Sequence, residues 1–210
     1  MIGFDKKNVK KHIDIKKPFA FNAFTSVLNS AIEKNLTDYH SCVILACIGT
    51  DRATGDSLGP LIGYKLTAMK HRGIHIYGTL EEPLHAKNLN EVINKIHSLH
   101  KNPFIIAIDA CLGNSGNIGV ITIGDGPLKP GSGVNKVLPE IGNIHITGIV
   151  NSGGFMELLT LQSTRLSIVM QMADLISSGI RFVFWKLQDK NLPQLKSTHN
   201  IELAHQALLN

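Results

Sequence analysis

Two uninterrupted apolar runs constrain the fold more than any other feature of the sequence. They are Cys42–Ile48 and Phe104–Ile108. Runs of this length and Val/Ile content are typical of strands buried on both faces of a parallel sheet. Segments with helical spacing of apolar residues separate the runs, and this alternation predicts βαβ units with helices on both faces of the sheet. Further strands are expected at 74–77, 118–123 and 145–150, and helices at 20–34, 57–70, 88–99, 155–161 and 164–185, the last interrupted near Gly179.

Composition indicates one soluble domain. The chain has 210 residues, of which 43% are hydrophobic and 18% charged, a balance that argues against disorder. Residues 1–18 are expected to form a basic N-terminal arm, and residues 19–210 a single α/β domain. The N-terminus lacks the apolar region of a secretory signal, and no apolar run reaches the about 18 residues of a membrane span. A cytoplasmic protein without membrane contact is therefore expected.

Charge and cysteine content exclude several function classes. The net charge of +5 comes largely from N-terminal lysines, but no aromatic residues lie among them, so specific nucleic-acid binding is not expected. The three cysteines, Cys42, Cys47 and Cys111, form no CxxC pair, which argues against both a disulfide framework and a zinc site. Buried cysteines of this kind are usually small core residues, although Cys111 follows Asp109 by two positions.

The first candidate segment, Gly49–Pro60, leaves the first apolar run and enters a helix. It has neither the GK[ST] ending of a Walker loop nor a GxGxxG fingerprint. Asp56 can serve chemistry, or it can cap the helix expected to begin at Ser57. Asp51 can bind substrate or simply form a turn.

Asp109 is the second candidate residue, because it directly follows the second apolar run. In parallel sheets, ligand sites lie beyond the carboxyl ends of the strands, so Asp109 and Asp56 are expected at one edge. Two carboxyls that meet there could share a proton for acid–base work or hold a divalent cation. The alternative is an acid that only accepts hydrogen bonds from nearby loop amides.

Two more strand ends are expected at the same edge. Asn151 and Ser152 precede a helix and could bind an anion or oxyanion, or form an ordinary helix entry. Glu81 could add a polar group or lie in an exposed loop. His85 and His145 lie near predicted strand ends and are candidate ligands.

The remaining histidines carry no metal-binding motif. No HExxH sequence is present, and His71, His75, His97, His100 and His199 are expected on the surface. A Ser/His/Asp triad stays open, but no GxSxG elbow supports one.

Three motifs carry a resemblance to a known family. They are Cys47–Leu61, with Thr-Gly-Asp-Ser-Leu-Gly-Pro at its core, Gly78–Ala86, and Ile108–Gly113. With them the chain resembles, from about 41 to 187, the YyaC family of sporulation proteins of spore-forming Firmicutes. That family is similar to the spore germination protease and to the maturation endopeptidases of nickel hydrogenases. The resemblance implies a three-layer α/β/α sandwich with a mostly parallel central sheet, of the phosphorylase/hydrolase-like, hydrogenase-maturation-protease type.

The resemblance also assigns roles to residues. The germination protease is an aspartic-type peptidase, and its two essential aspartates correspond to Asp56 in Asp-Ser-Leu-Gly-Pro and Asp109 in Ile-Asp-Ala. Asp51, Glu81, Asn151 and Ser152 would then contact substrate. The hydrogenase proteases bind nickel through two acids and a histidine, but no histidine lies in the corresponding segment, 151–154.

The sequence therefore predicts a sporulation-associated peptidase with two catalytic aspartates, without cofactor or bound metal. It would act on a protein or peptide, with small acid-soluble spore proteins as candidates, in the forespore or mother cell. A homo-oligomer stays open. The alternatives are a non-catalytic sporulation factor that binds a peptide, and a metal-dependent maturation-type endopeptidase using Asp56, Asp109 and His85 or His145.

Overall fold

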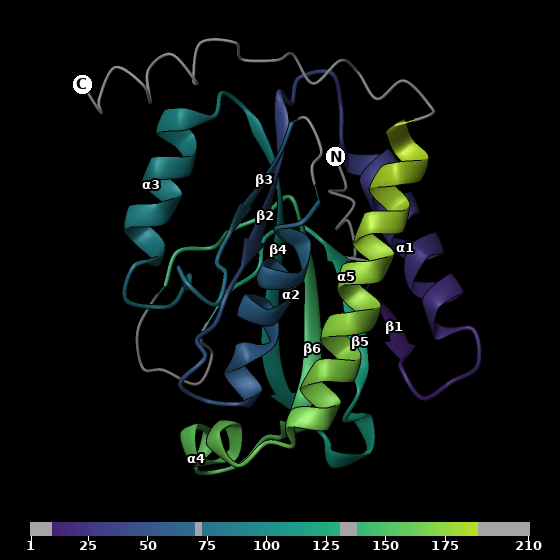
Figure 1. Cartoon of the computed structure of the whole chain (residues 1–210), viewed down its shortest axis with the longest axis vertical. Helices are drawn as coiled ribbons and strands as arrows, with labels where there is room; N and C mark the ends of the chain where they lie inside the picture. The colour runs from purple at the N-terminus through teal and green to yellow at the C-terminus, as the bar shows by residue number, and fades with distance from the viewer. Residues whose placement is uncertain (1–9, 70–72, 131–137, 189–210) are drawn as a thin grey trace, which may run out of the picture.

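The computed structural model describes residues 10–69, 73–130 and 138–188 (Figure 1). Within them, six strands form one sheet in the order β1-β5-β6-β4-β2-β3. The four strands β3, β2, β4 and β6 run parallel, and β5 and β1 are antiparallel to their neighbours. The mostly parallel central sheet is confirmed. The strands are β1 Lys11–Asp14, β2 Cys42–Cys47, β3 Ile74–Tyr77, β4 Pro103–Gly113, β5 Val120–Asp125 and β6 Ile144–Ser152.

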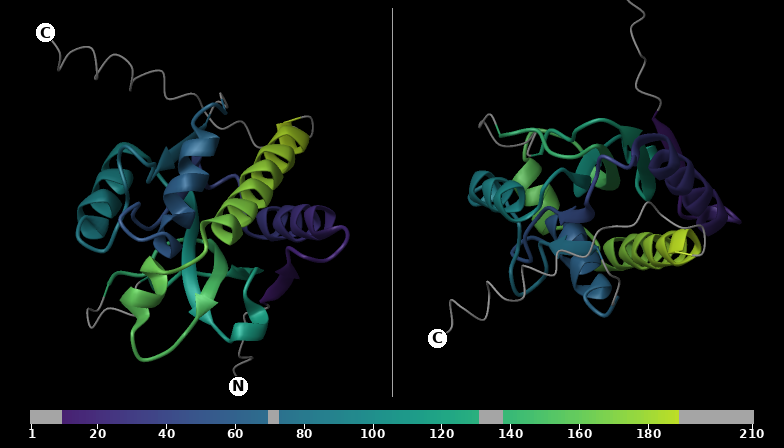
Figure 2. Two further views of the ribbon diagram at one scale, coloured as in Figure 1. Left: turned by 60° about the horizontal axis from the view of Figure 1, so that its bottom comes forward. Right: turned by 90° about the horizontal axis from the view of Figure 1, so that it is seen from above.

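Helices cover both faces of the sheet, as the alternating pattern predicts. The helices α1, α2 and α5 pack on one face and α3 packs on the other (Figure 1). Figure 2 shows α2 and α5 side by side, where they contact each other. The helix expected over 57–70 ends earlier, at Leu66. The helices are α1 Ala20–Asn35, α2 Leu58–Leu66, α3 Leu89–Leu99, α4 Glu157–Gln162 and α5 Leu166–Gln188, with 3-10 turns η1 Gly55–Ser57 and η2 Ser115–Asn117.

The two-sided burial of the central strands explains their unbroken apolar sequence. Successive side chains of a strand point to opposite faces. In β2, Val43 and Leu45 therefore pack beneath α1, α2 and α5, while Ile44 and Ala46 pack beneath α3. All six residues of β2 are buried. Both faces of this strand are covered by helices, so a polar side chain at any of these positions would be buried away from water.

Helix α5 is continuous, and the prediction of a break near Gly179 is wrong. A Cβ atom at Gly179 would lie 2.4 Å from the Phe24 ring of α1. The glycine therefore allows α1 and α5 to approach closely, and its sequence signal reflects packing rather than a break.

By length and composition alone, α5 could span a membrane, which the sequence analysis did not expect of any segment. Its residues Leu166–Leu187 include a window with a mean hydropathy of 1.3. However, Met172, Ile176 and Ile180 on this helix are fully buried against the sheet. The core helix of a soluble domain has the same apolar content for that reason.

Strand β4 extends beyond the predicted end of its apolar run. Its partner β6 pairs with it as far as Gly113↔Ser152, with an irregularity at Cys111. The other partner, β2, ends at the pair Cys47↔Ile108. Asp109 therefore lies on a strand segment that β6 still pairs but β2 no longer covers. This offset between the neighbouring strand ends leaves room beside Asp109 for the loop that follows β2.

The edge of the sheet includes part of the expected N-terminal arm. Residues 11–14 form β1 and pair with β5, and residues 1–9 lie outside the described part of the chain. Lys11 and His12 are exposed, as is typical of an edge strand that must not pair with another molecule.

Candidate functional site

The loop after β2 carries Asp56 and is fixed by close backbone contacts. Gly49 has φ 138°, and a Cβ atom there would lie 2.0 Å from the Asp56 carbonyl oxygen. The Thr50 N–H donates to that same oxygen over 3.1 Å. At the start of α2, a Cβ atom at Gly59 would lie 2.0 Å from the Ile48 carbonyl oxygen. Glycines at these two positions therefore allow the loop to fold back on the end of β2.

Asp56 does not cap α2. It lies within η1, the N-cap of α2 is Ser57, and no side chain donates or accepts a capping hydrogen bond there. Ser57 Oγ instead donates to the Thr54 carbonyl oxygen over 2.6 Å. The helix-cap explanation for Asp56 is therefore wrong, and its carboxyl group is available for other contacts.

Asp109 is buried and its charge interacts with that of Asp56. Its side chain is 8% exposed, and its Oδ1 accepts a hydrogen bond from the Ala110 N–H over 2.8 Å. Burial raises the pKa of Asp109 well above its usual value, the negative charge of Asp56 raises it further, and the Ala110 bond lowers it. The structure thus brings the two predicted acids together, with Asp109 as the one that retains its proton more strongly.

Asp56 has a different balance of influences. Burial raises its pKa, while a hydrogen bond from the Thr50 backbone and the charge of nearby His85 lower it. Burial is the largest influence on both acids, so the pKa of Asp56 is raised as well, but that of Asp109 is raised further and only Asp56 has a nearby imidazole that favours its ionised form. Such asymmetry is what assigns one member of an acid pair as proton donor and the other as base.

His85 reaches the site because its segment is tied to the loop after β2. The Gly49 N–H donates to the Leu84 carbonyl oxygen over 2.8 Å, and Leu84 forms a bridge with Ile48. The His85 N–H donates to Asn88 Oδ1 over 2.8 Å. The Nδ1 atom of His85 is buried without a hydrogen-bond partner. A buried nitrogen in that state is available to a bound substrate or water.

The second candidate histidine is used elsewhere. His145 Nδ1 lies 3.0 Å from the Gly126 carbonyl oxygen, and His145 interacts with the charge of Asp125. The structure therefore does not bring it to Asp56 and Asp109.

Asn151 positions the helix after β6. Its Nδ2 donates to the Thr160 carbonyl oxygen and to Thr164 Oγ1, over 3.2 Å each, and its Oδ1 accepts from the Ser152 N–H over 2.8 Å. Both polar atoms of the Asn151 side chain therefore form hydrogen bonds within the protein itself. Asp51 and Glu81 are exposed on the loops after β2 and β3.

Cys111 lies two residues after Asp109 on β4, and the negative charge of Asp109 affects the pKa of its thiol. Burial raises the pKa of the Cys111 thiol to about 11, with a further contribution from Asp109, and a hydrogen bond with Thr147 lowers it. At neutral pH the group is a thiol, so it is not an activated nucleophile.

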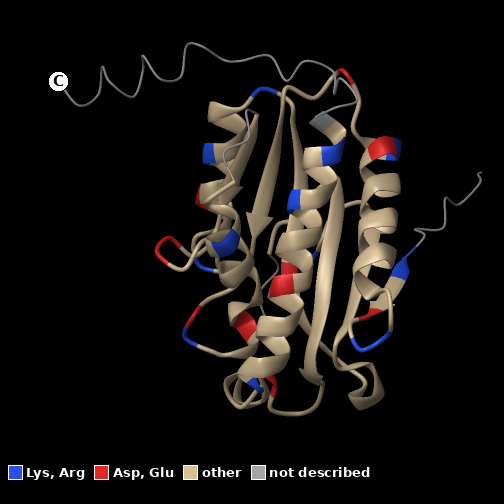
Figure 3. Ribbon diagram, turned by 45° about the vertical axis from the view of Figure 1, so that its right-hand side comes forward, with Lys and Arg blue, Asp and Glu red and all other residues tan. Residues whose placement is uncertain are grey.

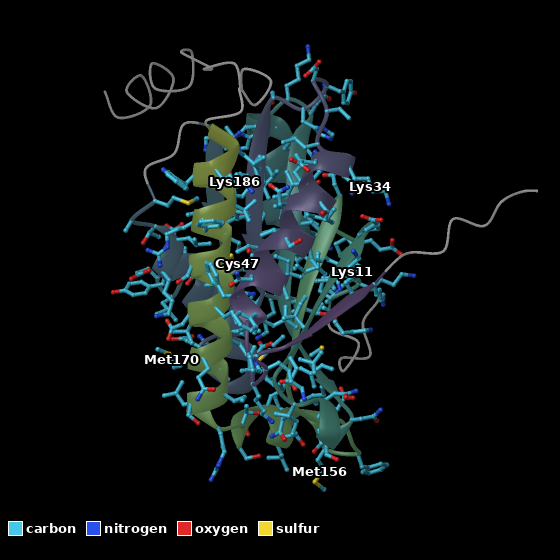
Figure 4. All side chains as sticks on the ribbon, turned by 90° about the vertical axis from the view of Figure 1, so that its right-hand side faces the viewer. Lys11, Lys34, Cys47, Met156, Met170 and Lys186 are labelled. Carbon is cyan, nitrogen blue, oxygen red and sulfur yellow. The ribbon has the colours of Figure 1, made fainter. Side chains whose placement is uncertain are left out.

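An exposed apolar surface, formed by Phe155, Met156, Leu158 and Leu159, borders the site. These side chains are 103%, 62%, 66% and 56% exposed. Figure 4 shows Met156 projecting at the end of the molecule opposite Lys186. The helix α4 contacts η1, which carries Asp56, through the face that bears Leu161, so the apolar surface lies on the outer side of the segment that packs against η1. The sequence analysis missed this surface because its spacing is also that of a helix packed on a core.

The ligand atoms of Asp56, Asp109 and His85 do not form a close three-residue group in the described part of the chain. Across 10–69, 73–130 and 138–188, one group of His, Cys and acidic side chains is arranged closely enough to hold a metal ion, and it does not include Asp56, Asp109 or His85. No histidine occurs in 151–154. The titratable groups at this site are two carboxyls and an imidazole.

Comparisons with known proteins agree with this fold. The family described as "Protein of unknown function (DUF1256)" matches residues 12–179. The chain is 50% identical over 175 residues to "Uncharacterized protein YyaC" of Bacillus subtilis (strain 168), which covers 83% of this chain and 84% of that protein. Its structure is similar to the NiFe hydrogenase maturation protease HycI from Thermococcus kodakarensis KOD1, with a TM-score of 0.54 and 17% identity, covering 76% of this chain and 99% of HycI.

These likenesses confirm two predictions from the sequence. The resemblance to YyaC extends over most of the chain, and the α/β fold is that of the hydrogenase maturation protease. At 17% identity the likeness to HycI shows the fold alone. The chain belongs to the DUF1256 family.

Proposed function

We propose that the protein is a sporulation-associated peptidase of the germination-protease type, in which Asp56 and Asp109 hydrolyse a peptide bond. The observation that carries the proposal is the coupling of the two acids. Asp109 is buried and its pKa is raised by burial and by the charge of Asp56. Two carboxyls whose charges interact and whose pKa values are raised to different extents can supply an acid and a base together.

The reaction follows from the unequal environments of the two acids. Asp56 is ionised and removes a proton from water, whose oxygen attacks the peptide carbonyl carbon. Asp109 gives its proton to the carbonyl oxygen, which yields a diol. When the C–N bond breaks, Asp56 returns its proton to the leaving nitrogen, and Asp109 regains one from a diol hydroxyl. Water is consumed and no group of the protein is altered.

The apolar surface on α4 supports a protein or peptide substrate. Exposed apolar patches on soluble proteins commonly mark sites of interaction, and this patch adjoins η1. An extended peptide bound to Phe155 and Leu159 would pass near Asp56. Small acid-soluble spore proteins, in the cytoplasm of the forespore or mother cell, are the proposed substrates. The side seen in Figure 3 carries residues of both signs, spread over its helices and loops.

The test uses purified full-length protein and three matched variants. We expect wild type to cleave extracted small acid-soluble spore proteins, as followed by mass spectrometry. Asp56→Asn and Asp109→Asn should lower the rate at least about a hundredfold, the scale of an acid–base contribution. Asp38→Asn changes an exposed acid before β2 and should leave cleavage intact. Folded wild type that cleaves nothing, or Asn variants as active as wild type, would refute the proposal.

A second function is favoured by the apolar surface alone. A sporulation factor without catalytic activity could bind a peptide there on the same fold. In that case Phe155→Ala together with Leu159→Ala would abolish a sporulation phenotype that Asp56→Asn leaves unchanged. If the protein is a peptidase, Asp56→Asn should itself abolish the sporulation phenotype.

A further inference from the structure

A second group of reactive side chains lies at the amino ends of the parallel strands, opposite to the carboxyl ends at which Asp56 and Asp109 lie. Cys42 is the first residue of β2, and His75 is the second residue of β3. His100 directly follows α3, and its N–H donates to the Ile96 carbonyl oxygen over 2.9 Å. These positions are the amino ends of the strands and the carboxyl end of the helix, whereas Asp56 and Asp109 lie beyond the carboxyl end of β2.

The fold directs the three side chains toward one another. Cys42 packs with the residues under α3, and Ile44 on the same face pairs with His75 in the parallel register. Residues two apart on a strand share a face, so Cys42 and His75 face α3 together. His100 then enters from the end of α3, and its ring centroid lies 4.3 Å from that of His75. One ligand atom from each of the three residues lies within 4.8 Å of the other two.

We propose that Cys42, His75 and His100 bind one transition-metal ion, with zinc as the ion that this ligand set fits. Zinc takes thiolate and imidazole ligands at about 2.3 and 2.0–2.1 Å in a tetrahedron, which spaces the ligand atoms about 3.3–3.6 Å apart. The side chains therefore need to close by on the order of 1 Å to reach the ion. Softer thiolate and imidazole ligands select zinc over magnesium or calcium.

The surroundings of the three ligands suit a bound cation. Tyr77 Oη lies 2.9 Å from His100 Nε2, so the phenol oxygen can accept a hydrogen bond from the Nε2–H and orient the ring when Nδ1 binds the ion. His100 is 8% exposed, so its ring is largely shielded from solvent. A fourth position remains for water, because three residues form the group.

Binding of an ion would change the protonation of Cys42 only, so the site stands on its geometry. Burial and the charge of His75 lower the pKa of His100 to about 4, and burial lowers that of His75. Both imidazoles are therefore neutral at neutral pH and present a lone pair. The Cys42 thiol, whose pKa burial raises, releases its proton to solvent when the ion binds.

The ion would tie α3 to β2 and β3, which gives the site a structural role. It lies apart from the acid pair, so the inference does not depend on the proposed peptidase activity. Loss of the ion is expected to loosen α3 and its loop, whereas the loop that carries Asp56 is held by separate contacts on β2.

The test titrates the full chain with cobalt, after removal of any histidine tag. Cobalt replaces zinc and absorbs visible light when tetrahedral, and a cysteine ligand adds a thiolate charge-transfer band in the near ultraviolet. We expect both signals at one equivalent of cobalt, their loss when zinc is added, and a thermal midpoint that rises with zinc. Cys42→Ser should remove the charge-transfer band, and His75→Gln or His100→Gln should weaken binding at least tenfold.

Matched controls distinguish this site from chance binding. His97→Ala removes an exposed histidine three residues before His100, and Cys111→Ser removes a cysteine beyond the other edge. Both variants should keep the full cobalt spectrum. Circular dichroism is used to check that the Cys42, His75 and His100 variants are folded. Absence of the spectrum from folded wild type, or its survival in Cys42→Ser, would overturn the inference.

Discussion

Replacing Asp109 with Asn should make the folded protein more stable than wild type at neutral pH, by a margin that grows with pH. Burial and the charge of Asp56 raise the pKa of Asp109 in the folded state well above the value of 3.8 that it has when exposed. Between those two pKa values the folded protein binds more protons than the unfolded chain. Stability therefore falls as pH rises through this interval.

The magnitude follows from proton linkage. One proton difference changes the free energy of unfolding by about 1.4 kcal/mol per pH unit. Asn does not titrate, and its Oδ1 can keep the hydrogen bond from the Ala110 N–H that Asp109 accepts. The variant thus avoids the ionisation cost without losing that contact. The difference between the two proteins should rise from pH 5 upward with a slope approaching about 1.4 kcal/mol per unit.

Other groups titrate in the same range and must be separated. The raised pKa of Asp56 gives a slope of the same sign. The lowered pKa values of His75 and His100 give the opposite sign, because the unfolded chain binds more protons below about pH 6.5. The two histidines lie apart from the substituted residue and cancel in the difference between variant and wild type, whereas Asp56 is measured separately in Asp56→Asn because its titration is coupled to that of Asp109.

The assay is urea unfolding followed by circular dichroism at half-unit steps from pH 5 to 8. Wild type, Asp109→Asn and Asp38→Asn are compared, the last being an exposed acid at the other end of β2. Asp38→Asn should track wild type at every pH. A difference between Asp109→Asn and wild type that is flat, or that shrinks as pH rises, would refute the argument that Asp109 is held protonated by its surroundings.

Three further outcomes follow from the site. Gly59→Ala should lower stability by about 3 kcal/mol in urea unfolding, because its Cβ would lie 2.0 Å from a carbonyl oxygen just after β2; unchanged stability would show that the loop has room to shift. Asn151→Ala should cost about 1–3 kcal/mol and increase hydrogen exchange in α4, because three hydrogen bonds of its side chain are lost; exchange that rises elsewhere instead would contradict this. Alkylation of Cys111 by iodoacetamide should keep accelerating up to about pH 11, the pKa of its thiol, and Asp109→Asn should move that profile to lower pH; a profile that levels off near pH 8.5, as for a free thiol, would contradict the burial argument.

The central sheet and the acid pair were predictable because both depend on local signals. The apolar runs that became β2 and β4 need cover on two faces, and only a buried parallel arrangement supplies it. Asp109 directly follows one run and Asp56 closes the loop after the other, so the edge rule for parallel sheets brings them together. The extension of β4 to Gly113 was not predictable, since it depends on pairing with β6 rather than on apolar content.

The structure also holds features that no local pattern encodes. Strand β1 has four residues, and its Lys11 and His12 are exposed at the edge of the sheet. A short polar segment of this kind has the same composition as a mobile arm, so the sequence did not indicate a strand. His100 and His75 were predicted to lie on the surface, but His100 is buried and His75 is half-buried. Cys42 was predicted to be a plain core residue. Cys42, His75 and His100 come together only because of the register between β2 and β3 and the position where α3 ends. Their spacing along the sequence matches no metal-binding motif, so the sequence alone could not reveal the cluster.

The most direct test of the acid pair is the protonation of its two carboxyls, measured without any substrate. Carbon-13 NMR of protein labelled at the aspartate carboxyl carbons follows each group as pH changes, and Asp56→Asn and Asp109→Asn assign the two signals. The account predicts that the Asp109 carboxyl keeps its proton well above the pH at which exposed aspartates ionise. It also predicts that Asp56→Asn moves its titration to lower pH. Two signals that titrate independently near pH 4, unaffected by the partner's substitution, would contradict the coupled pair on which the proposed peptidase rests.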